Sequence, residues 1–186
     1  MNKKIIVLVG ASGCGKSAIS NEIVKYDGFE RVVTDTTRKP RPKEVDGVAY
    51  NFVNRKSFDP KDYLEYTEYS GNYYGTKAKR IDNILKRGNV AVLIMDINGA
   101  EAVRKEYGVN LVDVIYIERN HEDIVAAIKA RNLPIEEENK RLAQLIADYQ
   151  SKQRCDRVIK NITIEHSAEQ IVTTFRLNND VIGWVG

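Results

Sequence analysis

A lysine and a serine follow a glycine-rich segment at a spacing that suits the binding of a phosphate chain. Residues 10–17 read GASGCGKS and match the pattern G-x-x-x-x-G-K-[ST]. The glycines let backbone N–H groups approach phosphate oxygens, and a helix that begins near Lys16 adds the positive end of its dipole. Lys16 can reach the terminal phosphates of a nucleotide, and the hydroxyl of Ser17 can bind Mg²⁺. The segment predicts a nucleotide site, with a chance glycine turn as the alternative.

The surroundings of this segment favour the nucleotide site. Residues 5–9 read IIVLV, as expected of a buried strand, and Ile19 and Ile23 share one helix face. The residues expected to contact the triphosphate are Gly10, Ala11, Ser12, Gly13, Cys14, Gly15, Lys16, Ser17 and Ala18. We interpret Cys14 as a small residue that contributes its backbone N–H. A redox-sensing thiol is the alternative, because a helix N-terminus lowers the pKa of a thiol.

Two further arginines suggest a second phosphate site. Arg38 and Arg41 lie three residues apart, and Pro40 and Pro42 stiffen the chain around them. Two guanidinium groups on a rigid loop can bind a phosphate group, although an exposed basic loop is an equally simple interpretation.

An acidic residue follows a second apolar run. Asp96 comes directly after residues 90–95, VAVLIM. It is well placed to hold a water of a Mg²⁺ shell. It can also cap a helix over INGAEAV, and the two roles are compatible.

The elements that position these residues form an α/β pattern. The apolar runs 5–9, 90–95 and 112–117 lack alternation, which is typical of a parallel sheet covered on both faces. Helical spacing connects Ile81, Ile84 and Leu85; Leu142, Leu145, Ile146 and Tyr149; and Ala168, Ile171, Val172 and Phe175. A capping box from Ser167 to Gln170 is expected to begin the last of these helices.

The chain is interpreted as one domain, residues 1–186, with a core at about 1–28, 76–130 and 142–186. The segment 29–75 is rich in Tyr, Thr, Pro and Gly, and we expect a small, mostly β lobe. The polar segment 131–141 contains Pro134 and is expected to be a mobile lid loop that runs into the helix at Leu142.

Composition narrows the classes of function. The net charge of +3 is mild and gives no support to a nucleic-acid partner. The two cysteines have no metal-site spacing, so a reducing cytoplasm fits. The five-residue apolar run before Gly10 is short for a signal peptide, and no run approaches the roughly 20 residues that span a membrane.

Six segments in order resemble the guanylate kinase family: GASGCGKS, TTRKPRPKEVDGVAYNFV, SGNYYGT, MDINGA, NKRL and VIKN. The resemblance covers nearly the whole chain. It implies a P-loop kinase that transfers the γ-phosphoryl group of ATP to GMP or dGMP with Mg²⁺. The implied partners are these small molecules, with no nucleic acid or membrane.

The resemblance also implies site residues. The acceptor phosphate would be held by Arg38, Arg41, Tyr50 and Tyr74, and guanine would be contacted by Thr34, Glu65 and Thr76. Thr34 stands where the family usually has serine. The Glu65 carboxylate would accept from guanine N1–H and its amine. Lys16, Arg131 and Arg141 would be catalytic, Ser17 and Asp96 would serve Mg²⁺, and Asn161 would lie near the adenine of ATP. Packing or surface roles are the alternatives for the aromatic residues, Glu65 and the arginines.

Three positions depart from the family pattern. Ile94 stands where an acidic residue usually helps to read guanine, Ala127 replaces an arginine, and Asn132 replaces a glycine in the lid. A kinase with a different or broader acceptor is therefore one alternative. A non-catalytic guanylate-kinase-like binding module is another, and the intact Lys16 and Ser17 argue against it. A GTPase is disfavoured because NKRL lacks the aspartate of N-K-x-D.

Overall fold

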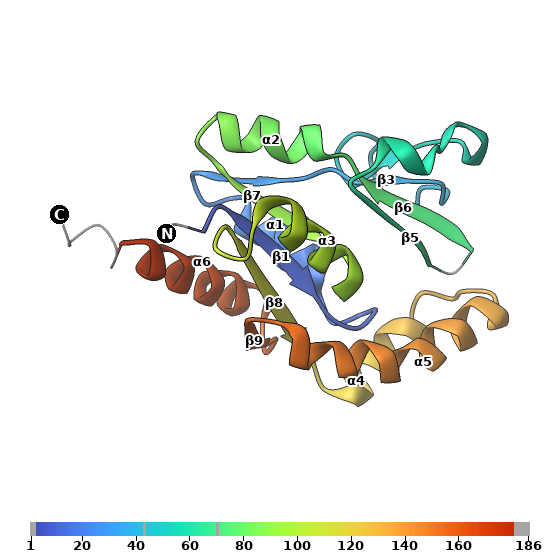
Figure 1. Ribbon diagram of the computed structural model, residues 1–186. Helices are drawn as coiled ribbons and strands as arrows, with labels where there is room; N and C mark the ends of the chain where they lie inside the picture. Colours follow the sequence, from blue (N-terminus) through green and yellow to red (C-terminus); the bar gives the residue numbers. More distant parts are fainter. Residues whose placement is uncertain (1–2, 43, 70, 181–186) are drawn as a thin grey trace.

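The computed structural model describes residues 3–42, 44–69 and 71–180, arranged as a core and a smaller lobe, each built on its own sheet (Figure 1). Ser70 of the SGNYYGT motif and residues 181–186 of the predicted core lie outside the described residues. Among those described, no helix has the length and apolar character to cross a membrane.

The core sheet has five strands in the order β2-β7-β1-β8-β9, and every neighbouring pair is parallel. The strands are β1 (Ile5–Val9), β2 (Phe29–Arg31), β7 (Val90–Ile94), β8 (Val112–Glu118) and β9 (Arg157–Lys160). The three predicted apolar runs form the three central strands. The predicted parallel α/β fold is therefore confirmed.

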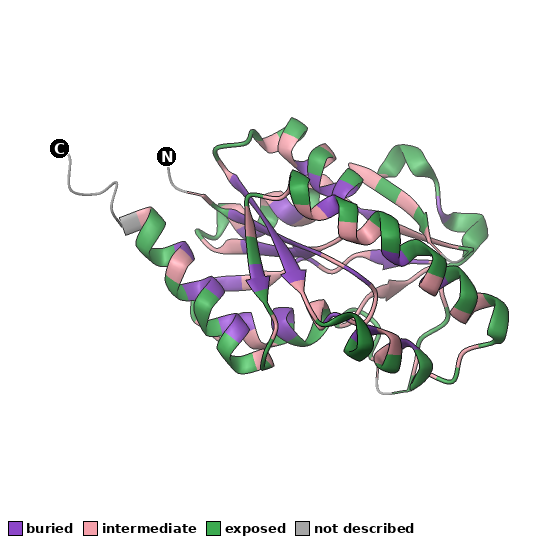
Figure 2. Ribbon diagram, turned by 90° about the horizontal axis from the view of Figure 1, so that it is seen from below, coloured by how far each residue is buried: buried purple, intermediate pink, exposed green. Residues whose placement is uncertain are grey.

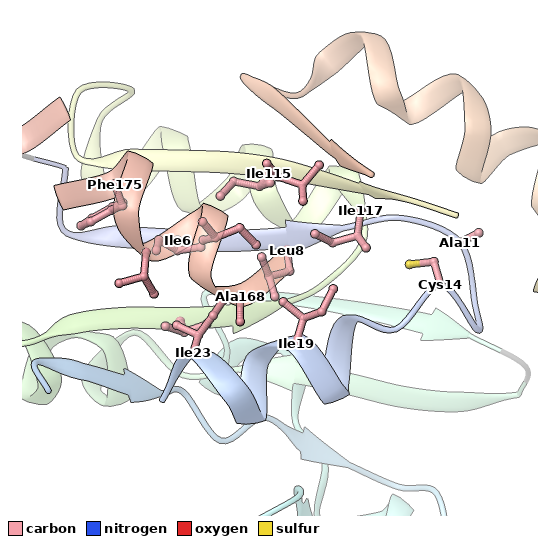
Figure 3. Packing of buried hydrophobic residues seen from close by; sticks show 14 of the residues in the cluster. Ile6, Leu8, Ala11, Cys14, Ile19, Ile23, Ile115, Ile117, Ala168 and Phe175 are labelled. Atoms are coloured by element: carbon pink, nitrogen blue, oxygen red, sulfur yellow. The ribbon is translucent and has the colours of Figure 1, made fainter. Parts of the chain in front are cut away.

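Helices cover both faces of this sheet, as the unbroken apolar runs predict (Figure 2). One face packs against α1 (Lys16–Ile23), α4 (His121–Lys129), α5 (Ile135–Gln150) and α6 (Ile164–Asp180). The other packs against α2 (Ala78–Lys86) and α3 (Ile97–Tyr107). In Figure 3, Ile6 and Leu8 of β1 pack against Ile19 and Ile23 of α1 on the first of these two faces. This packing fixes α1 directly behind the phosphate loop.

The smaller lobe is a mixed sheet in the order β4-β3-β6-β5. Its strands are β3 (Asp35–Thr36), β4 (Asn51–Phe52), β5 (Glu65–Tyr69) and β6 (Asn72–Thr76), with short helices η1 (Arg55–Ser57) and η2 (Pro60–Asp62). One boundary needs correction, because residues 29–31 pair with β7 in the core sheet. The mostly β character of the lobe agrees with the prediction.

The predicted lid loop is largely helical, so the prediction of a loop over 131–141 is wrong for its second part. Helix α5 begins at Ile135, with Pro134 as its N-cap and glutamates at 136–138 in its first turn. The negative charges stabilise the positive end of the helix, and the proline precedes the helix instead of interrupting it. Asn132 has a φ of 49°, in the left-handed region that asparagine and glycine tolerate better than most residues. That backbone conformation explains why asparagine is compatible with a position where glycine is usual.

The helix predicted around Leu142 is confirmed by α5, and the capping box predicted at Ser167 is wrong. Ile146 is 69% exposed, although Leu145 beside it is buried. Ser167 lies inside α6, where its hydroxyl donates to the carbonyl of Thr163 at 2.8 Å. The hydroxyl of Thr163 accepts from the backbone of His166 at 3.2 Å, which makes Thr163 the capping residue. The last described elements before α6 are η3 (Ser151–Arg154) and β9.

Candidate active site

The phosphate loop follows β1 and leads directly into α1. Gly10, Gly13 and Gly15 have φ values of 142°, 89° and 106°, which L side chains rarely adopt. A Cβ atom at Gly10 would lie 2.6 Å from the carbonyl oxygen of Ile117, so position 10 has room for glycine only. Gly15 is the N-cap residue of α1, so no side chain caps the start of this helix with a hydrogen bond. The N-terminus of α1 is therefore open to an anion.

The Lys16 side chain folds back over the phosphate loop. Its ammonium donates to the carbonyls of Gly10 at 2.6 Å and Ala11 at 2.9 Å, and lies 3.8 Å from the Cys14 sulfur. The side chain is thus held at the mouth of the loop. Cys14 is fully buried, in agreement with its interpretation as a small filler.

Ser12 joins the loop to the two predicted catalytic arginines. Its hydroxyl accepts from Arg131 at 3.2 Å and from Arg141 at 3.1 Å. The Arg141 side chain is only 4% exposed and donates to Glu137 at 2.6 and 3.2 Å. Arg131 lies in the α4–α5 connection and Arg141 lies on α5, and the tertiary fold brings both to one hydroxyl.

The lid arginines also face the arginines of the small lobe. The pKa of Arg131 is lowered, first by burial and then by the positive charges of Arg41, Arg141 and Arg38. Three positive charges within electrostatic range of Arg131 favour an anion beside it. The chain therefore forms one cationic space between the phosphate loop and the lobe.

The predicted acceptor-phosphate residues lie together, and an additional acid holds them. Glu44 binds the Arg38 guanidinium with two hydrogen bonds of 2.9 and 3.0 Å and accepts from the backbone N–H of Arg41 at 2.7 Å. Burial alone would raise the pKa of Glu44, but these hydrogen bonds outweigh it and the pKa is lowered. The Tyr50 ring lies 5.4 Å from the Arg38 guanidinium and 5.9 Å from the Tyr74 ring. Sequence reasoning missed Glu44, whose only signal was a charge three residues after Arg41.

A cavity of about 370 Å³ lies between β5 and α3, with Glu65, Asp96 and Gly99 in its wall. Burial raises the pKa of Glu65 to about 7, and the Asp96 charge adds to this while Thr76 opposes it. A Cβ at Gly99 would lie 3.0 Å from a Glu65 carboxylate oxygen, so a glycine here lets α3 approach the acid. The Thr76 hydroxyl is buried with no hydrogen-bond partner of good geometry. Thr34 is not among the described residues that line this cavity.

Asp96 caps a helix, and this confirms one of its two predicted roles. Its carboxylate accepts from the backbone N–H of Gly99 at 2.9 Å and begins α3. Asp96 and Ser17 follow β7 and β1, which are adjacent parallel strands, so both lie at the same edge of the sheet. A hydroxyl and a carboxylate, with the phosphates of a nucleotide, form the oxygen-only donor set that Mg²⁺ prefers, and Mg²⁺ usually keeps several waters. Within residues 3–42, 44–69 and 71–180, no cluster of three or more His, Cys, Asp or Glu side chains could hold a metal.

Asn161, at the end of β9, contacts the phosphate loop directly. Its amide donates to the Cys14 carbonyl at 2.7 Å, and its side-chain oxygen accepts from Ser167 at 3.2 Å. These two hydrogen bonds connect the phosphate loop, through Asn161, to Ser167 of α6.

Two residues that sequence reasoning missed also contact the loop. Asp148 accepts from the backbone N–H of Ser12 and faces Lys16; burial raises its pKa, while Lys16 and the Ser12 N–H oppose the rise. Arg119 donates to the Gly13 carbonyl at 3.3 Å. Asp148 lies two helical turns after Arg141, and Arg119 follows the central run 112–117, so their positions carried a weak signal.

The departure at Ala127 has a packing explanation. A Cβ at Gly13 would lie 3.3 Å from the Ala127 Cβ, so α4 and the phosphate loop are in close contact at this point. Ile94 is also accommodated, because it packs against the core cluster that contains Ile19. It does not line the cavity beside Glu65 in the described part of the chain.

The parallel sheet, the phosphate loop after its central strand and the arginines that reach this loop define the class of P-loop nucleotide kinases. A solved structure, the guanylate kinase of Anaplasma phagocytophilum, has a TM-score of 0.74 and 22% identity to this chain. The match covers 96% of this chain and 86% of that one, and it supports the fold.

Sequence comparison defines the family. A guanylate kinase family profile matches residues 2–177. The guanylate kinase of Fusobacterium nucleatum is 31% identical over 175 residues, which cover 91% of this chain and 94% of the relative. That of Rickettsia bellii is 32% identical over 175 residues, covering 91% of each. The chain belongs to the guanylate kinase family and is a nucleotide-binding transferase of that family.

Proposed function

We propose that this enzyme transfers the γ-phosphoryl group of ATP to the phosphate of GMP or dGMP, with Mg²⁺ bound to the nucleotide. The observation that carries the proposal is the cationic space at Arg131, which shares the Ser12 hydroxyl with Arg141 and lies within electrostatic range of Arg38 and Arg41 of the lobe. Two phosphate chains that must meet end to end need such a space between them. A site for a single nucleotide would not need the second pair.

The acceptor would lie in the lobe, residues that follow β2 up to about 75. Its phosphate would bind Arg38, Arg41 and the hydroxyls of Tyr50 and Tyr74. The base would enter the cavity beside Glu65, whose ionised carboxylate accepts from guanine N1–H and the exocyclic amine. The buried Thr76 hydroxyl, which opposes the rise in the pKa of Glu65, supports a polar contact there. Thr34 does not line this cavity in the described part of the chain, and its contact with the base is proposed from the family resemblance.

The donor would lie on the phosphate loop. Backbone N–H groups of residues 10–18 and the N-terminus of α1 would hold the phosphates, and Asn161 would approach the adenine from β9. Mg²⁺, when bound, supplies charge that neutralises phosphate oxygens, and Ser17 and Asp96 are the residues that would hold it and its water.

Catalysis would rest on position and charge. The acceptor phosphate already carries an anionic oxygen, so no protein nucleophile is needed. Lys16, Arg131 and Arg141 would surround the transferring group and stabilise its negative charge, while residues 131–141 would exclude water from it. We assign residues 131–141 as the lid, beside the acceptor lobe and a core formed by the rest of the chain.

The test is an ADP-release assay with Mg-ATP and each common nucleoside monophosphate, including IMP. GMP and dGMP should be used well, IMP less well because it lacks the amine, and AMP, CMP and UMP poorly. Comparable rates with AMP would replace the proposal with a kinase of broader acceptor range, the alternative that Ile94 suggests. Absence of turnover with every acceptor would favour a binding module.

A further inference from the structure

Tyr69 connects parts of the molecule that are distant in the sequence. It ends β5, at the far end of the strand from Glu65, and the β5–β6 hairpin reaches toward α4 and α5 (Figure 1). The guanidinium of Arg141, on α5, lies 5.1 Å from the centre of the Tyr69 ring. The lobe and the lid therefore touch at this ring.

The contact is made in a place with little water. Arg141 is 4% exposed, with Glu137 on one side, Ser12 on another and the Tyr69 ring against it. The Tyr69 hydroxyl is buried near Ser12 with no hydrogen-bond partner of good geometry. Burial raises the pKa of Tyr69, and the charges of Arg141 and Arg131 act in the opposite direction, which places both guanidinium groups near the ring.

An arginine that has lost its hydration shell is attracted to the face of an aromatic ring, and a flat ring also limits the directions that the guanidinium can adopt. Glu137 and the Ser12 hydroxyl hold Arg141 by hydrogen bonds, and the ring of Tyr69 adds a contact that comes from the lobe. Because the ring belongs to the lobe, Arg141 is fully held only when the lobe lies against α5.

We propose that Tyr69 is a positioning residue whose ring holds Arg141 against the phosphate loop, so that closure of the acceptor lobe aligns a lid arginine for phosphoryl transfer. The proposal rests on the proposed function, because it concerns the rate of that transfer. It predicts an effect on kcat and little effect on the binding of either nucleotide, since the ring acts through Arg141.

Tyr69→Phe and Tyr69→Leu separate the ring from the hydroxyl. We expect Tyr69→Phe to keep kcat within about twofold, and Tyr69→Leu to lower kcat by about tenfold or more, with both KM values within about twofold. In an Arg141→Ala background, Tyr69→Leu should have no further effect on kcat. A full additional decrease in that background, or an unchanged kcat in Tyr69→Leu, would overturn the proposal.

Tyr73→Leu is the matched control. Tyr73 lies on the neighbouring strand of the same hairpin, and the Arg55 guanidinium lies 4.2 Å from its ring, but no residue of the phosphate loop is involved. It should keep the kcat of the wild type, and an equal decrease in kcat would point to general damage to the hairpin.

A series of fluorinated phenylalanines at position 69 tests the same idea without a change of shape. Each fluorine weakens the attraction of the ring for a cation, so kcat should fall stepwise along the series. A flat series would contradict the proposal even if Tyr69→Leu were unfolded. A wild-type protein that is inactive with GMP would reject the proposed function, whereas an active wild type with an indifferent Tyr69 would reject this inference only.

Discussion

At the scale of single residues, Lys16 combines two tasks. Its ammonium closes the phosphate loop through the carbonyls of Gly10 and Ala11 and remains available to a phosphate. We expect Lys16→Ala to lower kcat/KM by about a hundredfold to a thousandfold, which corresponds to about 3–4 kcal/mol of transition-state stabilisation. The variant loses a donor aimed at the transferring charge in a partly dry site. ADP release measures this, and circular dichroism checks the fold. Lys25, 68% exposed on its side chain and paired with Glu22, provides a control: Lys25→Ala should be normal. Near-normal turnover of Lys16→Ala would contradict the assignment.

Glu65 should make acceptor binding dependent on pH. Its carboxyl pKa is raised to about 7 in the free enzyme, so the group is mostly protonated below that pH and ionised above it. Only the ionised form can accept from both donors of guanine. The KM for GMP should therefore be lowest above pH 7 and rise by roughly tenfold per unit as the pH falls below 7. A profile of KM for GMP and for ATP between pH 5.5 and 8.5 tests this, and a KM for GMP that is flat below 7 would reject it.

Glu65→Gln should remove that pH dependence and change base selectivity. The amide keeps the size of the side chain but can donate to adenine N1, whereas the carboxylate would face N1 with no partner. We expect a sharp fall in kcat/KM for GMP and a smaller ratio of GMP to AMP. Both acceptors are measured with both proteins, and an unchanged ratio would show that Glu65 does not read the base.

At the scale of elements, Arg38 and Arg41 of the segment between β3 and β4 are held by hydrogen bonds before any substrate arrives. Glu44 holds Arg38 with two hydrogen bonds and Arg41 through its backbone. Such a loop loses little conformational entropy when it binds a phosphate. Helix α5 acts similarly at the donor side, since it supplies Arg141 and Asp148 to the same serine of the phosphate loop.

Arg38→Ala and Arg41→Ala should raise the KM for GMP far more than the KM for ATP. Each removes a charge-assisted hydrogen bond worth about 1.5–3 kcal/mol, which corresponds to roughly a tenfold to hundredfold rise. Arg55→Ala, in the same lobe but with a half-exposed side chain, should leave both KM values unchanged. If the two arginine variants affected both substrates equally, separate donor and acceptor sites would be ruled out.

At the scale of the whole molecule, Asp35 connects the lobe to the core. Its carboxylate is nearly fully buried and accepts from Asn51 and Tyr63 of the lobe at 2.9 Å each and from Arg80 of α2 at 2.5 Å. Arg80 also donates to the carbonyl of Val33 at 2.6 Å. This network sets the direction in which the lobe leaves the core, and therefore where the acceptor lies relative to the phosphate loop.

Asp35→Ala should lower the free energy of unfolding by about 3–5 kcal/mol, because it leaves a partly buried guanidinium and two lobe donors without their shared partner. Urea denaturation measures the loss. Glu68→Ala removes an exposed ion pair with Arg55 and should cost at most about 1 kcal/mol. A loss for Asp35→Ala as small as that of Glu68→Ala would exclude this network as the support of the lobe.

The sequence by itself determined the parts that depend on local pattern. The runs 5–9, 90–95 and 112–117 are apolar on both faces, which only a covered parallel sheet can satisfy, and GASGCGKS requires a glycine turn before a helix. These features do not depend on distant residues, so the core and the phosphate loop could be predicted from them.

Tertiary structure alone decided where distant groups meet. It buried Ser167 within α6, extended α5 back to Ile135, exposed Ile146 and moved residues 29–31 into the core sheet. It also brought Glu44 to Arg38, Asp148 to Ser12 and Tyr69 to Arg141. Such contacts arise from the packing of elements that lie far apart in the chain. Their energies depend on burial and geometry, and neither quantity is encoded in the spacing of residues along the sequence.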